Sequence, residues 1–218
     1  MRALQLLANR SLAVAELADP SPPGPGEVQV RIGALALNHI DVWGWRGMAF
    51  AKRKLPIVVG VEAAGTVDAI GEGVAGLKRG DIVAIYGAET CGVCKECRAG
   101  RDNFCENVRG IRGFHVDGLA RERLNIAERL AIKAPAGVSV IAAATAPVTY
   151  GTPEHMLFDN AMLTAGQTVL VQAGGSGVGT AAIQLAKAAG AIVITTVGSP
   201  DKVEKARALG ADHVINYR

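Results

Sequence analysis

Residues 166–217 read GQTVLVQAGGSGVGTAAIQLAKAAGAIVITTVGSPDKVEKARALGADHVINY. Short runs rich in valine and isoleucine alternate in this stretch with longer alanine-rich or charged runs, and glycines separate most of them. The pattern predicts strands at residues 168–172, 191–197 and 212–216 and helices at residues 177–189 and 200–209. This β-α-β-α-β order is typical of one half of a doubly wound α/β domain with a parallel sheet.

A glycine-rich loop, AGGSGVG at residues 173–179, joins the first predicted strand to the first predicted helix. It follows the dinucleotide pattern G-x-G-x-x-G with Gly174 first and Gly179 last, but with Ser176 in the middle position. Backbone N–H groups between these glycines would meet a pyrophosphate at the helix N-terminus. The candidate cofactor-binding residues are Gly174, Gly175, Ser176, Gly177, Val178 and Gly179. The alternative is a plain strand–helix turn that binds nothing.

All four cysteines lie close together with the spacing C-x2-C-x2-C-x7-C, as Cys91, Cys94, Cys97 and Cys105. Disulfides between such near neighbours would close strained loops, whereas four thiolates suit a tetrahedral zinc ion. A site with four cysteine ligands has no open position, so the zinc would be structural and would order a lobe at about residues 89–108. An iron–sulfur cluster or a redox cluster is the alternative.

The part of the chain before residue 136 is predicted to be rich in β-strand. Runs rich in valine and glycine, bounded by turn residues, lie at residues 28–37, 57–74 and 79–87. A strand within residues 115–125 is left undecided by Arg121 and Arg123. Residues 137–157 are alanine-rich and are predicted to be helical until Pro153 perturbs the helix.

The cysteine spacing resembles the structural-zinc lobe of the medium-chain dehydrogenase/reductase superfamily, which includes the zinc alcohol dehydrogenases and their quinone-reductase relatives. The resemblance covers essentially the whole chain. It implies a GroES-like, β-rich catalytic domain at residues 1–136 and the first part of a Rossmann domain at residues 137–218. Because members of the family run considerably further, it also implies a chain truncated at the C-terminus. Ser176 in the glycine loop is more similar to the quinone-reductase branch.

The end of the second predicted strand favours NADPH over NADH. An NAD-binding site would have an acidic residue there to hold the ribose hydroxyls, and the resemblance places that position at Val197. Ser199 could donate a hydrogen bond to a 2′-phosphate and Lys202 could supply a positive charge. Asp201 is interpreted as a first-turn residue of the following helix, where a carboxylate suits the helix dipole. NAD stays possible.

The zinc alcohol dehydrogenases have a second, catalytic zinc, and the resemblance places its three ligand positions at Asn38, Val61 and Val148. A catalytic zinc needs about three protein ligands, and valine cannot supply one. The histidines are too widely spaced to rebuild such a site, being His39, His115, His155 and His213. We therefore expect no catalytic zinc, and we assign Glu62 no chemistry.

Without that zinc, the chain resembles the zinc-free quinone and enone reductases at NHID, residues 38–41, and at the glycine loop. Those enzymes need mainly positioning and hydrogen-bond polarisation. Asn38 is the expected polar group near the nicotinamide or the substrate carbonyl, Trp43 an aromatic lining of the pocket, and Asp41 a third candidate catalytic residue. Packing alone is the alternative for Trp43, and a structural turn is the alternative for Asp41. His39 and Thr152 complete the cofactor-binding candidates, His39 at a phosphate-contacting position.

Composition excludes several classes of protein. Half of the 218 residues are hydrophobic, a fifth are charged and the net charge is +3, which is ordinary for a soluble globular protein. No dense Lys/Arg cluster suggests nucleic acid, and no apolar run reaches the ~18 residues of a membrane span. Residues 1–17 are apolar but lack the pattern of a signal peptide. We expect a cytoplasmic protein with reduced thiols.

The sequence thus predicts an α/β protein that reduces a small quinone or α,β-unsaturated carbonyl compound with NADPH and without a catalytic zinc. One alternative is an alcohol dehydrogenase with an altered zinc site. The other is a non-catalytic nucleotide-binding fragment. The resemblance also implies a homodimer for a complete chain.

Overall fold

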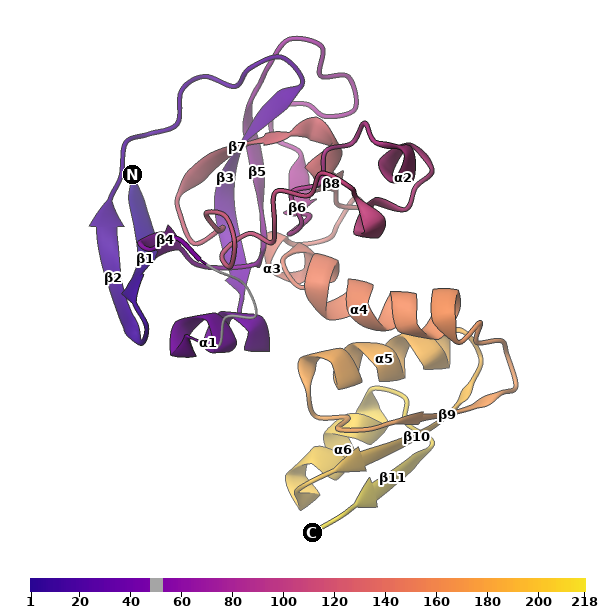
Figure 1. The fold of residues 1–218 in the computed structure, drawn as a ribbon. Helices are drawn as coiled ribbons and strands as arrows, with labels where there is room; N and C mark the ends of the chain where they lie inside the picture. The colour runs from indigo at the N-terminus through magenta and orange to yellow at the C-terminus, as the bar shows by residue number, and fades with distance from the viewer. Residues whose placement is uncertain (48–52) are drawn as a thin grey trace. The chain divides into compact units, whose positions relative to one another are not determined.

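The computed structural model describes residues 1–47 and 53–218 (Figure 1). The chain divides by its internal contacts into two compact units, Met1–Val148 and Thr149–Arg218. This division falls later along the chain than the limits of the predicted domains, which stay a prediction.

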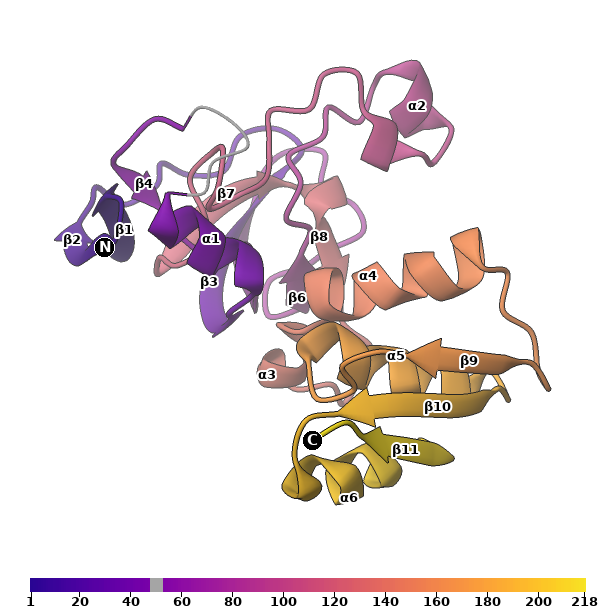
Figure 2. The ribbon, with the colours of Figure 1, turned by 60° about the horizontal axis from the view of Figure 1, so that its bottom comes forward.

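The first unit is built from two antiparallel sheets (Figures 1 and 2). The larger sheet has the strand order β7-β3-β5-β6-β8 and the smaller one β2-β1-β4. The strands of the larger sheet are β3 Glu27–Ala36, β5 Glu62–Ile70, β6 Ile82–Ile85, β7 Arg123–Ala127 and β8 Ala131–Lys133. Those of the smaller sheet are β1 Arg2–Ala8, β2 Ser11–Glu16 and β4 Ile57–Val58.

Alternation along β3 places the core of the first unit. Val28 and Val30 are fully buried, because successive side chains of a strand point to opposite faces of the sheet. Val30 pairs with Val67 of β5 on one side and with Leu124 of β7 on the other, so three strands contribute to one apolar layer. The wider cluster also contains Ala63, Leu77, Val83, Ile85, Leu119, Ile126 and Ala131.

Two segments to which the sequence analysis assigned no strand form strands in the structure. The apolar N-terminal residues form the hairpin β1–β2, in which Leu4 lies opposite Val14 and Leu6 is buried. Strand β7 begins at Arg123. The Nε of Arg123 forms an ion pair with Asp68 Oδ2 at 3.4 Å. Among the residues that the structure describes, no helix is both long and apolar enough to cross a membrane.

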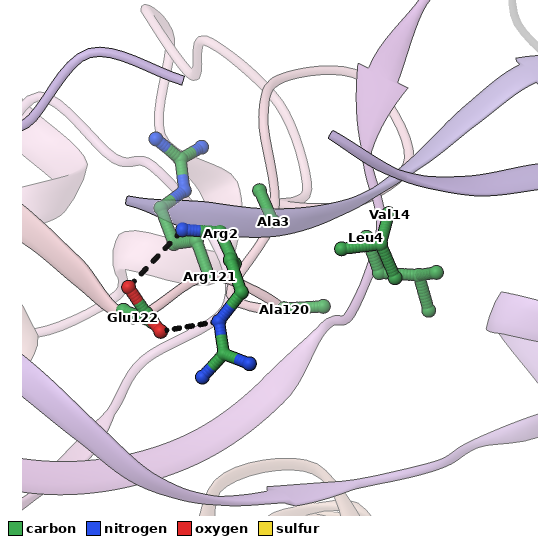
Figure 3. Close-up of a pocket in the computed structure, with 7 residues that line it drawn as sticks. All are labelled: Arg2, Ala3, Leu4, Val14, Ala120, Arg121 and Glu122. Atoms are coloured by element: carbon green, nitrogen blue, oxygen red, sulfur yellow. Dashed lines mark hydrogen bonds and ion pairs between the residues drawn. The ribbon is translucent and has the colours of Figure 1, made fainter. Parts of the chain in front are cut away.

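The start of β1 is held to the residues before β7. The backbone N–H and Nε of Arg2 both donate to the Glu122 carboxylate, at 3.1 and 2.8 Å (Figure 3). A hollow of about 290 Å³ lies beside this ion pair, and Figure 3 labels its lining residues as Arg2, Ala3, Leu4, Val14, Ala120, Arg121 and Glu122. Most of these residues lie where β1 pairs with β2 and with residues 120–122.

Short helical segments connect the strands of the first unit. They are α1 His39–Arg46, α2 Lys95–Arg98, the 3-10 helices Asp102–Phe104 and Glu128–Leu130, and α3 Val140–Ala143. The start of α3 is capped by Ser139, whose Oγ accepts a hydrogen bond from the N–H of Ala142 at 3.2 Å.

Residues 146–160 are helical, but not as one regular α-helix. The π-helical segments Ala146–Tyr150 and His155–Asn160 flank α4, Gly151–Glu154. Pro153 lies inside α4 and has no N–H to donate to the preceding turn. The expected perturbation at Pro153 is therefore seen as wider turns on either side of it, and the helical region continues to Asn160.

The second unit contains the predicted β-α-β-α-β segment. Its parallel sheet has the order β11-β10-β9, with β9 Thr168–Val171, β10 Ile192–Val197 and β11 His213–Asn216. Helix α5, Gly177–Ala188, packs on β9 and β10, while α6, Pro200–Ala208, packs on β10 and β11. Ile183, Ala186 and Val193 are fully buried where α5 meets the sheet.

Candidate functional site

The four cysteines lie together at the tip of the first unit that carries α2. Their sulfur atoms all lie within 4.8 Å of one another, and Cys91 Sγ is 3.9 Å from Cys97 Sγ. Zinc–sulfur bonds of about 2.3 Å in a tetrahedron place sulfurs about 3.8 Å apart. All four thiols are free of disulfide bonds, so the donor set and its spacing fit a four-coordinate zinc ion.

Backbone N–H groups point at these sulfurs, as they do around metal-binding thiolates. The N–H groups of Val93 and Cys94 lower the pKa of the Cys91 thiol to about 6. The N–H of Cys97 lowers the pKa of Cys94, whereas desolvation raises that of Cys97 to about 12. A bound cation would offset the cost of holding all four as thiolates.

Arg129, in the short 3-10 helix between β7 and β8, is hydrogen-bonded to the residue that precedes the cysteine lobe. Its Nη1 donates to Thr90 Oγ1 at 2.9 Å, and its Nη2 donates to the Thr90 carbonyl. Thr90 is buried and directly precedes Cys91, so this contact fixes where the lobe begins. The sequence analysis did not identify Arg129, since nothing in the sequence near it marks a contact 39 residues away.

The glycine loop forms the sharp turn that its pattern predicts. Ser176 is the N-cap of α5: its Oγ accepts from the N–H of Gly179 at 3.0 Å and donates to the Ala173 carbonyl at 2.8 Å. A Cβ added to Gly179 would overlap that same carbonyl, and one added to Gly174 would overlap Thr195 Oγ1. Both glycines are therefore needed for close packing of loop, strand and helix.

The middle of the loop is open. Gly175, Ser176, Gly177 and Val178 are exposed, whereas Gly174 and Gly179 are buried. Helix α5 is long enough for its N-terminal N–H groups to present a positive dipole end at this exposed edge. The arrangement suits an anionic group such as a pyrophosphate.

The residues after β10 lie close to this loop. A Cβ on Gly175 would be 2.9 Å from Lys202 Cδ, so the lysine side chain lies over the loop. Ser199 is the N-cap of α6, and its side-chain hydrogen bond lowers the pKa of Asp201. Asp201 lies in the first turn of α6, the location that the sequence predicted.

Asn38 is joined to a buried acid that the sequence analysis passed over. Asn38 Nδ2 donates to Glu62 Oε2 at 2.8 Å, and the backbone N–H of Val148 donates to Glu62 Oε1 at 2.7 Å. Glu62 is fully buried at the start of β5. A signal existed in the sequence, since Glu62 is the one charged residue between Ile57 and Thr66.

Asp41 has a structural role in the fold. Its Oδ2 accepts from the N–H of Asn38 at 2.8 Å and so caps the first turn of α1. Burial raises the pKa of Asp41, while hydrogen bonds from the N–H groups of Asn38, Val61 and Gly60 oppose that rise. The carboxyl group thereby ties the start of α1 to the residues before β5.

The other candidates from the sequence lie in different places. His39 and Trp43 are exposed on α1, with ring centroids 6.2 Å apart. Val61 is buried next to Glu62. Thr152 is exposed in α4, in the second unit. The structure thus joins Asn38 and Val148 to each other through Glu62.

The residues at positions 38, 61 and 148 do not fit a catalytic zinc. Two are valines, and Glu62, the buried acid that follows position 61, already accepts hydrogen bonds from the other two segments.

Comparison with known families gives two matches. Residues 24–136 match the family described as alcohol dehydrogenase GroES-like domain, and residues 177–218 match that described as zinc-binding dehydrogenase. The cysteine lobe and Glu62 fall within the first match, and helix α5 begins the second.

Individual relatives span the whole of the chain. An NAD-dependent alcohol dehydrogenase of Saccharolobus solfataricus is 32% identical over 99% of this chain, which spans 64% of that protein's length. An acryloyl-coenzyme A reductase of Metallosphaera sedula is 35% identical over 93% of this chain, which covers 59% of that protein.

Solved structures have the same fold. The crystal structure of an NAD-dependent alcohol dehydrogenase superposes with a TM-score of 0.93 at 45% identity, covering all of this chain and 64% of that one. A thermostable alcohol dehydrogenase from Pyrobaculum aerophilum, solved with cobalt and zinc bound, superposes with a TM-score of 0.87 at 32% identity over 99% of this chain and 64% of that one.

Proposed function

The chain belongs to the medium-chain dehydrogenase/reductase superfamily, and we propose that it is an NADPH-dependent oxidoreductase that works without a catalytic zinc. The proposed substrate is a small quinone or α,β-unsaturated carbonyl compound. The relative named acryloyl-coenzyme A reductase supports this class, because an acryloyl group contains an activated C=C bond.

One observation carries the proposal. Asn38 and Val148, at two positions that the resemblance assigns to zinc ligands of the alcohol dehydrogenases, are both hydrogen-bonded to the Glu62 carboxylate. Protein donors thus take up the Glu62 carboxylate, an acidic group that could otherwise have anchored an ion between these segments. Chemistry at this place would rest on hydrogen bonding and positioning, which suffice for reactions whose hydride comes from a cofactor.

The second unit would hold the cofactor. Exposed N–H groups of the glycine loop and the N-terminus of α5 would bind its pyrophosphate, and Lys202 would meet a 2′-phosphate. When bound, the reduced dinucleotide supplies the hydride. The name of the Saccharolobus relative keeps NAD as an alternative.

Residues of the first unit would meet the substrate and hold the fold. Asn38 would present its carboxamide to the substrate, and Trp43 would supply an aromatic wall. Asp41 would fix the helix that carries both. His39 would contact phosphate. The four cysteines would bind a structural zinc that orders the lobe around α2.

The alcohol dehydrogenase names among the relatives and solved structures favour a second candidate function. In it, a small alcohol is oxidised and its hydride passes to the oxidised dinucleotide. A cytoplasmic location and a homodimer stay predictions. A non-catalytic nucleotide-binding protein is the remaining alternative.

A substrate panel tests the proposal. The chain is mixed with NADPH or NADH and with a quinone, a cyclic enone, an acryloyl thioester or a saturated ketone, and loss of dihydronicotinamide absorbance is followed. We expect oxidation of NADPH with the quinone, the enone or the thioester, unchanged by a chelator during the assay. Turnover of the ketone alone, abolished by the chelator, would favour the zinc alcohol dehydrogenase. Binding of NADPH without turnover would favour the non-catalytic alternative.

A further inference from the structure

We propose that Glu62 does the structural work of the missing catalytic metal, joining three segments of the first unit, and that it is the positioning residue for Asn38. The joining role stands by itself. The positioning role rests on the proposed function, because it concerns how Asn38 meets a substrate.

The three segments are far apart in the sequence. Asn38 directly precedes α1, Glu62 begins β5, and Val148 is separated from Glu62 by 86 residues. Metal ligands at positions 38, 61 and 148 would hold the same segments together. The carboxylate has an acceptor oxygen for each of the other two segments, at 2.8 and 2.7 Å, so it makes a link without an ion.

Burial shows that this link is more than an incidental contact. Glu62 is fully buried and is followed along β5 by the fully buried Ala63 and Ala64. A carboxylate in such surroundings is strongly unfavourable unless charged or polar donors surround it. Asp41 lies close enough for the charge of Glu62 to contribute, after burial, to raising the pKa of Asp41. The N–H groups of Asn38 and Val148 are donors that offset the cost of burying the Glu62 carboxyl group.

The carboxylate also fixes which way the Asn38 side chain faces. Both Glu62 oxygens act as acceptors, so the amide nitrogen of Asn38 points at Oε2 and the amide oxygen points elsewhere. Glu62 accepts from the Asn38 amide nitrogen, and the Asn38 side chain also takes part in a capping box with the backbone N–H of Asp41. Asn38 is half-buried, so its second amide N–H can still meet a ligand while Oδ1 faces the first turn of α1. Glu62 thereby prevents the carboxamide from flipping.

A glutamine at position 62 cannot replace the carboxylate. Its side chain has one acceptor and one donor, whereas Asn38 and Val148 both donate. Glu62→Gln therefore keeps both hydrogen bonds only if the Asn38 carboxamide turns over, so that Asn38 Oδ1 accepts from Gln Nε2. Asn38→Asp alone places two carboxylates together. The double variant Glu62→Gln/Asn38→Asp restores both hydrogen bonds with the polarity of one reversed, since Gln Nε2 donates to Asp and Gln Oε1 accepts from Val148.

Unfolding in urea tests the joining role. We expect Asn38→Asp to raise the unfolding equilibrium constant about tenfold or more, Glu62→Gln to raise it less, and the double variant to recover most of the loss seen in Asn38→Asp. Glu72→Gln, at an exposed acid, controls for the change of charge and should have no effect. A double variant no more stable than the worse single variant, folded or not, would overturn the joining role.

Nuclear magnetic resonance and kinetics test the positioning role. The Asn38 side-chain amide should give one pair of resonances, with one proton shifted by the carboxylate and protected from exchange; in Glu62→Gln the shift and the protection should be lost. With the quinone or enone that the wild type turns over, the double variant should stay at least about tenfold slower in kcat despite its recovered stability. Wild-type kcat in the double variant, or an unprotected Asn38 amide in the wild type, would overturn it. An inactive wild type would count against the proposed function and leave the urea and resonance results to decide this inference.

Discussion

Asn38 Nδ2 lies 2.8 Å from Glu62 Oε2, inside a unit where Glu62 has no exposed surface at all. The amide belongs to the residue that precedes α1 and the carboxylate to the residue that begins β5. The pair thus links the start of α1 to the start of β5 directly through two side chains. In the proposal above, this link does the work that a catalytic metal would do at positions 38, 61 and 148.

The cysteine lobe should depend on its ion. Cys94 is nearly buried and caps α2, so Cys94→Ser should lose the bound zinc and at least about 3 kcal/mol of stability. Val93→Ser changes an exposed side chain in the same loop and should leave both unchanged. Metal analysis of the dialysed protein and urea unfolding measure the two effects. Full zinc content in Cys94→Ser would show that the quartet does not hold the metal.

The glycine loop offers a matched pair of substitutions. Gly179→Ala drives a Cβ into the Ala173 carbonyl and should cost about 1–3 kcal/mol, with weaker dinucleotide binding. Gly177→Ala meets Thr149 Cγ2 at an ordinary 3.5 Å and should stay within about 0.5 kcal/mol of the wild type. Urea unfolding and NADPH fluorescence titration test this. Equal effects of the two substitutions would contradict the packing of this loop.

Cofactor choice should depend on Lys202. If its ammonium group meets a 2′-phosphate, Lys202→Ala should weaken NADPH binding about tenfold and hardly affect NADH. Lys205→Ala is the control, because it removes the same charge from the same helix. The Lys205 ammonium group lies 4.0 Å from the Asp201 carboxylate and is not expected to meet the cofactor. Titrations at low and high salt should show the NADPH effect shrinking with salt. A loss that is equal for both dinucleotides would place Lys202 at the pyrophosphate instead.

The second unit should lose stability in acid through Asp212. Hydrogen bonds from Lys187 Nζ at 2.6 Å and from the N–H of Val193 at 2.8 Å lower the pKa of Asp212 below its usual 3.8. A lowered folded pKa gives stability that is present above the unfolded pKa and is lost as the pH falls through the folded one. Asp212→Asn should therefore be less stable than the wild type at neutral pH, and the difference should narrow below about pH 4.

The control for that prediction is Glu204→Gln, which removes an exposed ion pair with Arg207. It should have little effect at any pH, since exposed pairs contribute little. A difference for Asp212→Asn that grew as the pH fell would have the wrong sign for a lowered pKa.

The second unit could be predicted from sequence almost element by element. Its strands are short apolar runs that are followed by turn residues such as Gly174 and Gly198. The hydrophobic periodicity and the turn residues therefore indicate the same element boundaries. The hairpin β1–β2 was missed because its apolar residues, including Leu6 and Leu12, resemble a leader segment as much as a strand. Arg123 obscured β7, since its ion pair with Asp68 depends on a distant strand.

The candidate site was predictable only in its local parts. Cysteine spacing and the glycine pattern are each complete within a few residues, so the quartet and the Ser176 cap could be anticipated. The Glu62 contacts join residues 24 and 86 positions away, and no local pattern encodes such a meeting. Asp41 was a catalytic candidate because its neighbours resemble a family motif, whereas its bonds in the structure are to backbone N–H groups.

The central claim is that this protein keeps a metal for structure and uses Glu62 where relatives use a catalytic metal. Anomalous diffraction at the zinc edge, on crystals grown with excess zinc, tests it most directly. We predict one strong peak, enclosed by Cys91, Cys94, Cys97 and Cys105, and none beside Glu62. A second peak bonded to the Glu62 carboxylate, with Asn38 turned away from it, would contradict the account.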